Sequence, residues 1–143
     1  MTTTETVDRV APTPTGRTPL PSPGDATVVV FRRDGRATTY LLLHDRSAGT
    51  WCPPSGRRAG AESPKTCARR HVVQDTGLHL YPIPTAFGTD DSDVYLAQAV
   101  PGADVTLSSA HDRYEWVEAA EAASRCAPLA DSIGRVAALV ELG

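Results

Sequence analysis

The sequence has few cysteines and no long hydrophobic run, and both absences bear on the class of protein. It contains three cysteines among 143 residues, an odd number without a CxxC pair. This argues against a disulfide framework and predicts reduced, intracellular thiols. No apolar run approaches the roughly 20 residues that a helix needs to span a bilayer, and the N-terminus lacks the basic and apolar segments of a secretory signal. We therefore expect a soluble, cytoplasmic protein with no membrane partner.

A strong charge of either sign is also lacking. The formal net charge is -3, from 14 basic and 17 acidic residues. No overall field therefore attracts nucleic acid or an anionic membrane, and nucleic acid is not expected as a partner. Lys65 is the only lysine. An anionic ligand would be held by local arginines, whose planar guanidinium groups fit phosphate oxygens, although a compositional bias of the genome explains the same arginine count.

The chain divides into a short arm and one domain. Residues 1–24 are rich in threonine and proline and poor in apolar residues. Such a segment cannot bury enough surface to offset the entropy lost on ordering, so we expect a disordered arm. Residues 25–143 are long enough for a single globular domain.

β-Branched and apolar residues predict several strands in this domain. They are expected at residues 25–33, 38–45, 93–100 and 114–117, with one or two shorter segments around Pro82 and Pro84. Asp34-Gly35 predicts a hairpin turn between the first two strands.

Two helices are predicted, one central and one at the end of the domain. Ser63 before Pro64 supplies the N-cap and first turn of a helix over residues 64–76, and Gly77 ends it. The second helix is expected over residues 131–142, with Asp131 as its N-cap and a helical turn at 118–124 before it. Its apolar face is formed by Ile133, Val136, Ala137 and Val140. Strands with interspersed helices predict an α/β fold, a mixed sheet covered by helices.

Residues 56–78, GRRAGAESPKTCARRHVVQDTGL, carry the most specific motif. This stretch resembles the Nudix box, in which a glycine, five residues, a glutamate and seven residues precede Arg-Glu-apolar-x-Glu-Glu-x-Gly-apolar. The matching positions are Gly56, Glu62, Arg70, Val72, Gly77 and Leu78. WCPPSG stands where the family has Trp-x-Leu-Pro-Gly-Gly, and YEWVEAAEA is similar to its Trp-Val and acidic helical turn. The resemblance covers about residues 25–142.

The resemblance implies a fold, an activity and a cofactor. The fold is the Nudix-like α/β/α sandwich with a mixed β-sheet. The activity is hydrolysis of a nucleoside diphosphate linked to another group, so the partner is a small-molecule diphosphate or a nucleotide. The cofactor is Mg²⁺ or Mn²⁺, held by carboxylates that also supply the base for water. The family resemblance is compatible with a homodimer.

The sequence departs from the family where the box should carry three glutamates. Those positions hold His71, Gln74 and Asp75. We expect Asp75 to be the main catalytic residue and metal ligand, with Gln74 assisting and His71 as a second metal ligand. Removing two formal charges at about 4 Å from a dication costs several kcal/mol of attraction at an effective dielectric near 20. Mg²⁺ or Mn²⁺ is therefore expected to bind weakly, and Zn²⁺ is less favoured as the cofactor.

Many family members use a further glutamate on a later loop. By its spacing from Trp116, that position aligns with Ala110. The neighbours His111, Asp112 and Glu115 are candidates to replace it.

The other candidate site residues form two groups. Four are expected to brace the loop, namely Gly56, Glu62, Arg70 and Gly77. Three are candidates to contact the substrate, namely Arg57, Arg58 and Trp51. Solvated arginines and a tryptophan packed in the core are the alternatives.

Two other segments have competing interpretations. Cys67, His71 and Asp75 are spaced to form one column on the helix, which could hold a transition metal. A tetrahedral structural site needs four ligands, so we favour Cys67 in the core and His71 without a metal. The aspartates of residues 89–93 could bind a cation, but a polar loop is the favoured interpretation.

Two functions from different classes remain open. The first is a divergent Nudix-type hydrolase. The second is a catalytically silent Nudix-fold module that binds a nucleotide or phosphorylated small molecule, as the loss of two box glutamates suggests. A third, weaker hypothesis is other chemistry in the same pocket with His71 as acid or base.

Overall fold

The computed structural model describes residues 25–89 and 92–142, so the predicted arm lies outside the described residues. The strands are β1 (Asp25–Asp34), β2 (Ala37–Asp45), β3 (Trp51–Cys52), β4 (Ser55–Arg57), β5 (Ile83–Pro84), β6 (Ser92–Ala99) and β7 (His111–Val117). The helices are α1 (Pro64–Thr76), α2 (Ala119–Arg125) and α3 (Ala130–Leu142), with the 3-10 turn η2 (Ala127–Leu129) between the last two. Among the described residues, no helix is both long and apolar enough to cross a bilayer.

The strands form one mixed sheet in the order β3-β2-β1-β6-β5. β1 runs parallel to β6 and antiparallel to β2. The beginning of β1 also pairs with β4, so that Ala26 lies opposite Gly56. β7 pairs with β2 on the other side from β1. The pairing of β4 with β1 attaches Gly56, the start of the box motif, directly to the central strand.

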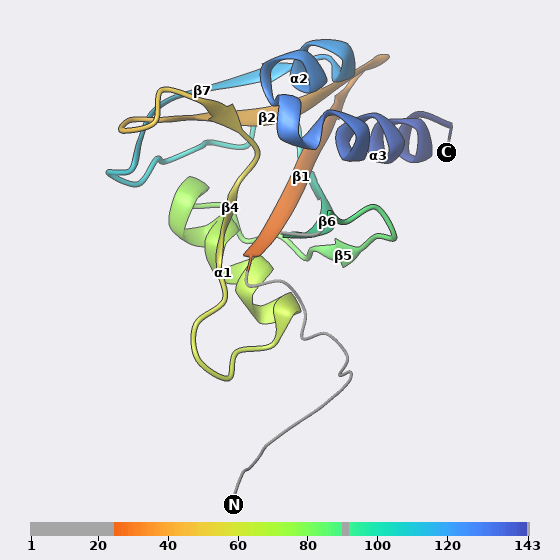
Figure 1. The fold of residues 1–143 in the computed structure, drawn as a ribbon. Helices are drawn as coiled ribbons and strands as arrows, with labels where there is room; N and C mark the ends of the chain where they lie inside the picture. Colours follow the sequence, from red (N-terminus) through yellow and green to blue (C-terminus); the bar gives the residue numbers. More distant parts are fainter. Residues whose placement is uncertain (1–24, 90–91, 143) are drawn as a thin grey trace, which may run out of the picture.

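Helices cover both faces of the sheet (Figure 1). Because side chains alternate along a strand, β1 contributes Val28 and Val30 to one core and Val29 and Phe31 to the other. The first core includes Cys67, Ala68 and Val72 of α1. The second includes Ala122 of α2 with Ile133, Val136, Ala137 and Val140 of α3. The predicted α/β/α sandwich with a mixed sheet is confirmed.

The helix predicted over residues 64–76 is confirmed with both of its caps. The Ser63 hydroxyl accepts a hydrogen bond from the Thr66 backbone N–H at 3.2 Å. Gly77 adopts a left-handed conformation with φ of 73°, and its N–H donates to the Val73 carbonyl at 2.9 Å. A glycine suits this position because a side chain would be strained at such a φ.

The hairpin after β1 is also confirmed, with its turn shifted by one residue. Asp34 pairs with Ala37 and is the last residue of β1. The two-residue loop is therefore Gly35-Arg36, with Gly35 at φ of 65°. Glycine adopts this positive φ with little strain because it has no Cβ.

Two other predicted boundaries were wrong. α3 begins at Ala130, directly after η2, so Asp131 lies in its first turn and is not the N-cap. There Asp131 accepts a hydrogen bond from Arg135 at 2.9 Å. β7 begins at His111, three residues earlier than expected, because it follows β2 to that strand's end at Asp45. The short strand predicted around Pro82 and Pro84 is present as β5, which consists of Ile83–Pro84.

Candidate active site

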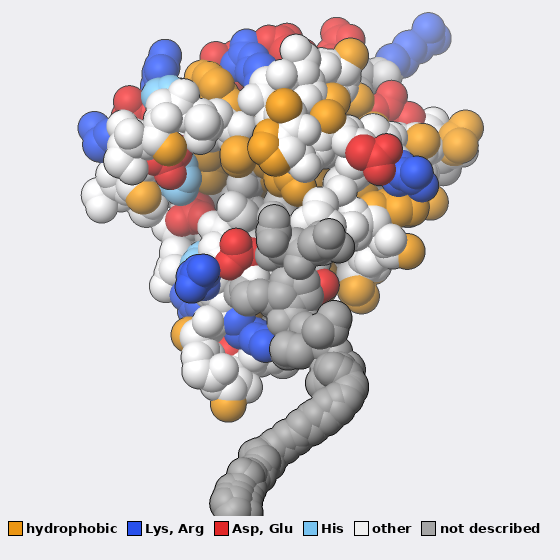
Figure 2. Space-filling view, viewed as in Figure 1, with side chains coloured by type: hydrophobic (Ala, Val, Ile, Leu, Met, Phe, Trp, Pro, Cys, Tyr) orange, Lys and Arg blue, Asp and Glu red, His pale blue; other side chains and the backbone are white. Residues whose placement is uncertain are grey.

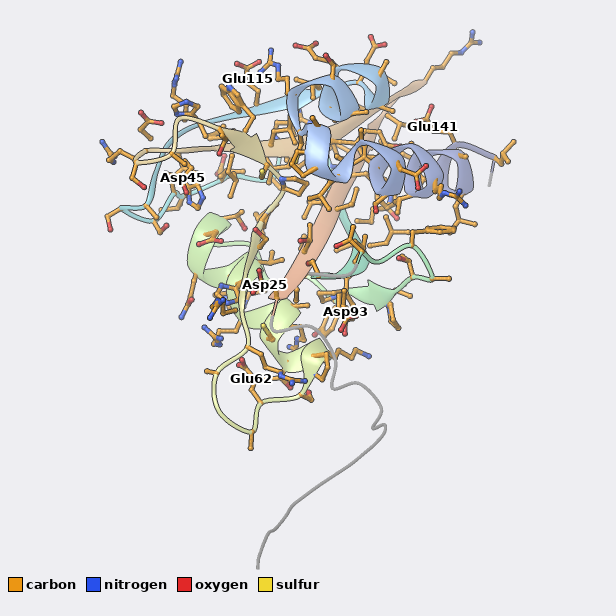
Figure 3. All side chains as sticks on the ribbon, in the orientation of Figure 1. Asp25, Asp45, Glu62, Asp93, Glu115 and Glu141 are labelled. Carbon is orange, nitrogen blue, oxygen red and sulfur yellow. The ribbon has the colours of Figure 1, made fainter. Side chains whose placement is uncertain are left out.

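The loop between β4 and α1 is tied to the helix by one ion pair. The Arg70 guanidinium donates from Nε to Glu62 Oε2 at 2.6 Å and from Nη2 to Glu62 Oε1 at 2.8 Å. Glu62 Oε1 also accepts the Ala59 N–H at 3.0 Å. The hydrogen bonds from Arg70 and Ala59 lower the pKa of Glu62 to about 2. Figure 3 labels Glu62 in this loop.

Arg70 contacts two further groups. Its Nη2 donates to the Arg57 carbonyl at 3.1 Å, and its Nη1 donates to Gln74 Oε1 at 3.2 Å. The side-chain oxygen of Gln74, a residue expected to assist Asp75, therefore accepts a hydrogen bond from Arg70. The Gln74 side chain lies on the exposed surface of α1.

His71 lies against the start of the same loop. Its Nε2 is 2.9 Å from the Arg57 carbonyl oxygen. A carbonyl only accepts hydrogen bonds, so this contact assigns the proton to Nε2 in the neutral ring. The ring also fills the space beside Gly56, where a Cβ would lie 2.0 Å from His71 Cε1. A side chain at position 56 is therefore incompatible with this position of His71.

Asp75 is the carboxylate that remains at the box positions, and it is only 8% exposed. Burial raises the pKa of Asp75 above its ordinary value, because the charged form loses its hydration. The imidazoles of His111 and His71 and a hydrogen bond from Ser108 oppose this rise. The site thus has one buried carboxylate with two histidines near it, where the family has a cluster of glutamates.

Ser108 lies in the loop before β7, and His111 is the first residue of β7. The loop is held by Arg46, whose backbone N–H donates to the Ala110 carbonyl at 2.9 Å and whose Nε donates to the Ser109 carbonyl at 3.1 Å. Ser108 was not predicted from the sequence, because it comes near Asp75 only through this long-range packing.

The two other candidates for the loop glutamate are engaged elsewhere. Asp112 Oδ1 lies 2.7 Å from His44 Nδ1. Glu115 lies 3.2 Å from Arg125 of α2, and Figure 3 labels it at the opposite end of the molecule from Glu62. Of the three candidates, His111 is the one whose charge acts on Asp75.

These residues do not fit a resident Mg²⁺ or Mn²⁺ ion. Hard cations of this kind are held by about six oxygens, several of them from carboxylates or water. At the box positions the Gln74 oxygen faces Arg70, His71 Nε2 faces the Arg57 carbonyl, and Asp75 alone offers a carboxylate. Within residues 25–89 and 92–142, no three His, Cys, Asp or Glu side chains are grouped so as to hold a metal ion.

The proposed column of Cys67, His71 and Asp75 is likewise no metal cluster among the described residues. Cys67 is 1% exposed and belongs to the core under α1. Its thiol donates to the Gly56 carbonyl at 3.7 Å. The favoured interpretation, with Cys67 as a core residue, agrees with this packing.

The candidate substrate contacts lie in two places. The Arg57 side chain on β4 is 90% exposed, with its Nε 3.7 Å from Asp25. Arg58 follows it and is partly buried. Trp51 packs against the core on the α2 and α3 face of the sheet, where guanidinium groups of Arg125 and Arg113 lie 5.0 and 5.4 Å from its ring centre. Asp75, in contrast, belongs to α1 on the other face.

The surface charge around these elements is mixed. Figure 2 shows basic and acidic side chains interspersed over the visible face, with no broad patch of one sign. This mixture of charges on the visible face is in line with the small net charge of -3.

Comparisons with known proteins agree with this fold. The family model described as NUDIX domain matches residues 21–139. An Ap4A hydrolase from C. elegans, solved as a binary complex, has a TM-score of 0.73 at 20% identity over 81% of this chain and 97% of that one. The MutT protein of Methanosarcina mazei Go1 has a TM-score of 0.57 at 26% identity over 82% of this chain and 95% of that one.

One curated relative is much longer than this chain. It is an octanoyltransferase from Myxococcus xanthus, 27% identical over 113 residues. The match spans 69% of this chain but only 32% of that protein, so the chain corresponds to about a third of the relative's length.

Proposed function

Because this chain belongs to the NUDIX domain family, we propose that it is a divergent Nudix-type hydrolase. Its substrate would be a nucleoside diphosphate-linked or related diphosphate compound, cleaved with the help of a divalent metal ion. The name of one similar structure, an Ap4A hydrolase, supports a nucleotide-containing substrate class.

The observation that carries this proposal is the retained frame of the box around a buried carboxylate. Glu62 and Arg70 join the loop to α1 through two short hydrogen bonds. A loop fixed in this way can hold a substrate in one orientation without further ordering on binding. Asp75, on the same helix, keeps an ionisable oxygen at the third glutamate position.

The metal enters this proposal with the substrate. Because the protein residues do not fit a resident Mg²⁺ or Mn²⁺, we propose that the ion would arrive bound to the diphosphate of the substrate. A divalent ion would neutralise charge on the diphosphate oxygens and orient them for attack by water. Asp75 is the carboxylate that would face this ion, with His71 and Gln74 beside it. The exposed Arg57 side chain, with Arg58, would meet the remaining phosphate oxygens.

The test is release of nucleotide or phosphate from a panel of nucleoside diphosphate and triphosphate derivatives. Each substrate is assayed with Mg²⁺, Mn²⁺ and Zn²⁺ in turn, using the unchanged chain, Asp75→Asn and Asp104→Asn. Asp104 is an exposed aspartate outside the box, so its variant is the matched control for the same chemical change. We expect turnover in the unchanged chain and in Asp104→Asn, and at least a tenfold loss in Asp75→Asn. Absence of turnover with every metal, from a protein shown to be folded, would contradict the proposal.

A second candidate is a Nudix-fold module that binds such a compound without cleaving it. The specific observation in its favour is that two of the three box positions contact other protein groups. Gln74 accepts a hydrogen bond from Arg70, and His71 contacts the Arg57 carbonyl in the loop. Restoring the box with His71→Glu, Gln74→Glu and Asp75→Glu together separates the two candidates. If the chain is a hydrolase, the unchanged protein should already turn over substrate, and the triple variant should have a modestly higher rate. If it is a silent module, the unchanged protein should bind the ligand without cleaving it, and turnover should occur in the triple variant or in neither protein.

A further inference from the structure

Two cysteines that are distant in the sequence meet in the fold. Cys52 lies on β3 and Cys126 is the residue that ends α2, and their Sγ atoms are 3.2 Å apart. Both are free thiols in this structure. A disulfide has an S–S distance of about 2.0 Å, so the sulfurs would need to approach each other by about 1 Å.

The contact is set by the packing of two separate elements on one core. Cys52 pairs with Leu43 of β2, which fixes β3 at the edge of the sheet. Cys126 is held by the hydrogen bond of its N–H to the Ala122 carbonyl at 3.1 Å. Cys126 is only 1% exposed, whereas Cys52 is partly exposed. Cys52 is therefore the sulfur that a small reagent reaches, and Cys126 is the sulfur behind it.

We propose that Cys52 and Cys126 form a reversible thiol–disulfide site that is closed by a hydroperoxide and reopened by a thiol reductant. The proposal is independent of the hydrolase activity, since it rests on a sulfur pair on the other side of the sheet from Asp75. It also differs from a structural disulfide framework, because both sulfurs are thiols in the folded protein.

The oxidation proceeds in two balanced steps. The Cys52 sulfur attacks one oxygen of hydrogen peroxide, so that an S–O bond forms, the O–O bond breaks and water leaves. The Cys126 sulfur then attacks the Cys52 sulfur, so that the S–S bond forms, the S–O bond breaks and a second water leaves. The two thiols lose two electrons and two protons in total, and the peroxide is reduced to two waters.

The chemistry of the two thiols suits these roles. The Cys126 thiol donates a hydrogen bond to the Cys52 sulfur, which lowers the pKa of Cys52 to about 7. More of Cys52 is then in the thiolate form near neutral pH than for an ordinary cysteine, and the thiolate is the reactive form. The pKa of Cys126 is raised by the same hydrogen bond and by burial, so Cys126 keeps its proton until Cys52 has reacted.

The third cysteine provides an internal comparison. Cys67 is buried in the other core, under α1, and its sulfur faces the Gly56 carbonyl. Burial raises the pKa of the Cys67 thiol. Cys67 is therefore expected to stay reduced under conditions that oxidise the pair.

A disulfide between Cys52 and Cys126 would also restrain the segment that leads from β3 to the box loop. β3 leads through Pro53 and Pro54 to β4, and the Pro54 carbonyl accepts the Val28 N–H at 2.9 Å. A bond from Cys52 to α2 would fix the first end of this segment as well. Trp51, next to Cys52, packs among the same side chains and should report the change by its fluorescence.

The experiment uses the full chain, reduced and then freed of reductant. Hydrogen peroxide is added, and the thiols are titrated under denaturing conditions. We expect the titre to fall from the three thiols of the sequence to one, with a mass loss of about 2 Da and a peptide link between Cys52 and Cys126. Closing a long loop should raise Tm by roughly 5–15 °C, and dithiothreitol should return the protein to its starting Tm.

Three variants make the assignment specific. Cys67→Ser should keep the loss of two thiols, whereas Cys52→Ser and Cys126→Ser should each abolish the internal link. The peptide link in the unchanged chain decides the proposal even if a variant fails to fold. Retention of all three thiols, oxidation of Cys52 to sulfinic acid with Cys126 free, or a bond between two chains would each overturn it.

Discussion

The His71 ring lies directly against the backbone of Gly56, so that this side chain of α1 fills the space between the helix and β4. A Cβ added to Gly56 would come within 2.0 to 2.3 Å of three atoms of the imidazole. His71 also faces the carbonyl of the next residue, Arg57, at 2.9 Å. The histidine that replaces a glutamate of the family pattern thus helps to close the loop onto α1.

Gly56→Ala should destabilise the fold through this contact. Overpacking of this kind costs about 1–3 kcal/mol, measurable by urea denaturation. Adding His71→Ala to Gly56→Ala should recover much of the loss, because it removes the ring that clashes. Gly134→Ala in α3 is the matched control: its Cβ meets nothing within 4 Å, so it should be neutral or stabilising. Equal effects of the two glycine substitutions would contradict the packing of His71.

The Glu62–Arg70 pair should make stability depend on acidity over a defined range. The pKa of Glu62 falls from 4.5 to about 2 on folding. The contribution of ionised Glu62 is therefore complete above about pH 4.5 and is lost as the pH falls toward 2. Glu62→Gln should have a lower Tm than the unchanged chain at pH 7, and the difference should shrink across this range.

Arg70→Gln is the check on that interpretation, because it removes the partner of Glu62 and leaves the carboxyl in place. The stability of this variant should show the same reduced dependence on pH. If Glu62→Gln and the unchanged chain differed by a constant Tm at every pH, the ion pair would not be the source of the effect.

Asp75→Asn should separate stability from function. Burial raises the pKa of Asp75, so this group favours folding most when it is protonated, and that advantage is lost as the pH rises through its folded pKa. At neutral pH the neutral amide avoids the cost of a buried charge. Thermal melts at pH 7 should give an equal or higher Tm for Asp75→Asn, together with the loss of turnover expected under the proposed function. A clear fall in Tm would mean that the ionised carboxylate is held by favourable contacts.

Arg46→Ala should loosen the loop that brings His111 toward Asp75. Arg46 Nε donates to the Ser109 carbonyl at 3.1 Å, and its Nη2 lies 3.5 Å from the His111 carbonyl. Hydrogen exchange of the amides in residues 108–111 should become faster, with little change in Tm, because Arg46 is exposed. Arg36→Ala, in the β1–β2 hairpin, changes the same residue type elsewhere and should leave this exchange unchanged.

Local signals allowed much of the fold to be predicted. The bounds of α1 followed from Ser63, Pro64 and Gly77, because caps act within one turn of the chain. The prediction of Asp131 as an N-cap was wrong because the preceding residues also form a helical turn. η2 runs directly into α3, so the helix needs no capping side chain at that residue. The start of β7 was missed because pairing with β2, rather than its own sequence, extends it to His111.

The sequence by itself determined the frame of the candidate site: the spacing of Gly56, Glu62, Arg70 and Gly77 is a property of one continuous segment. Which groups meet around that frame was decided by tertiary structure. Cys52 and Cys126 are 74 residues apart, and their sulfurs touch only because β3 and α2 pack on the same core. Hydrogen bonds and caps within a segment are specified by neighbouring residues, whereas contacts between segments depend on how the whole sheet is assembled and covered.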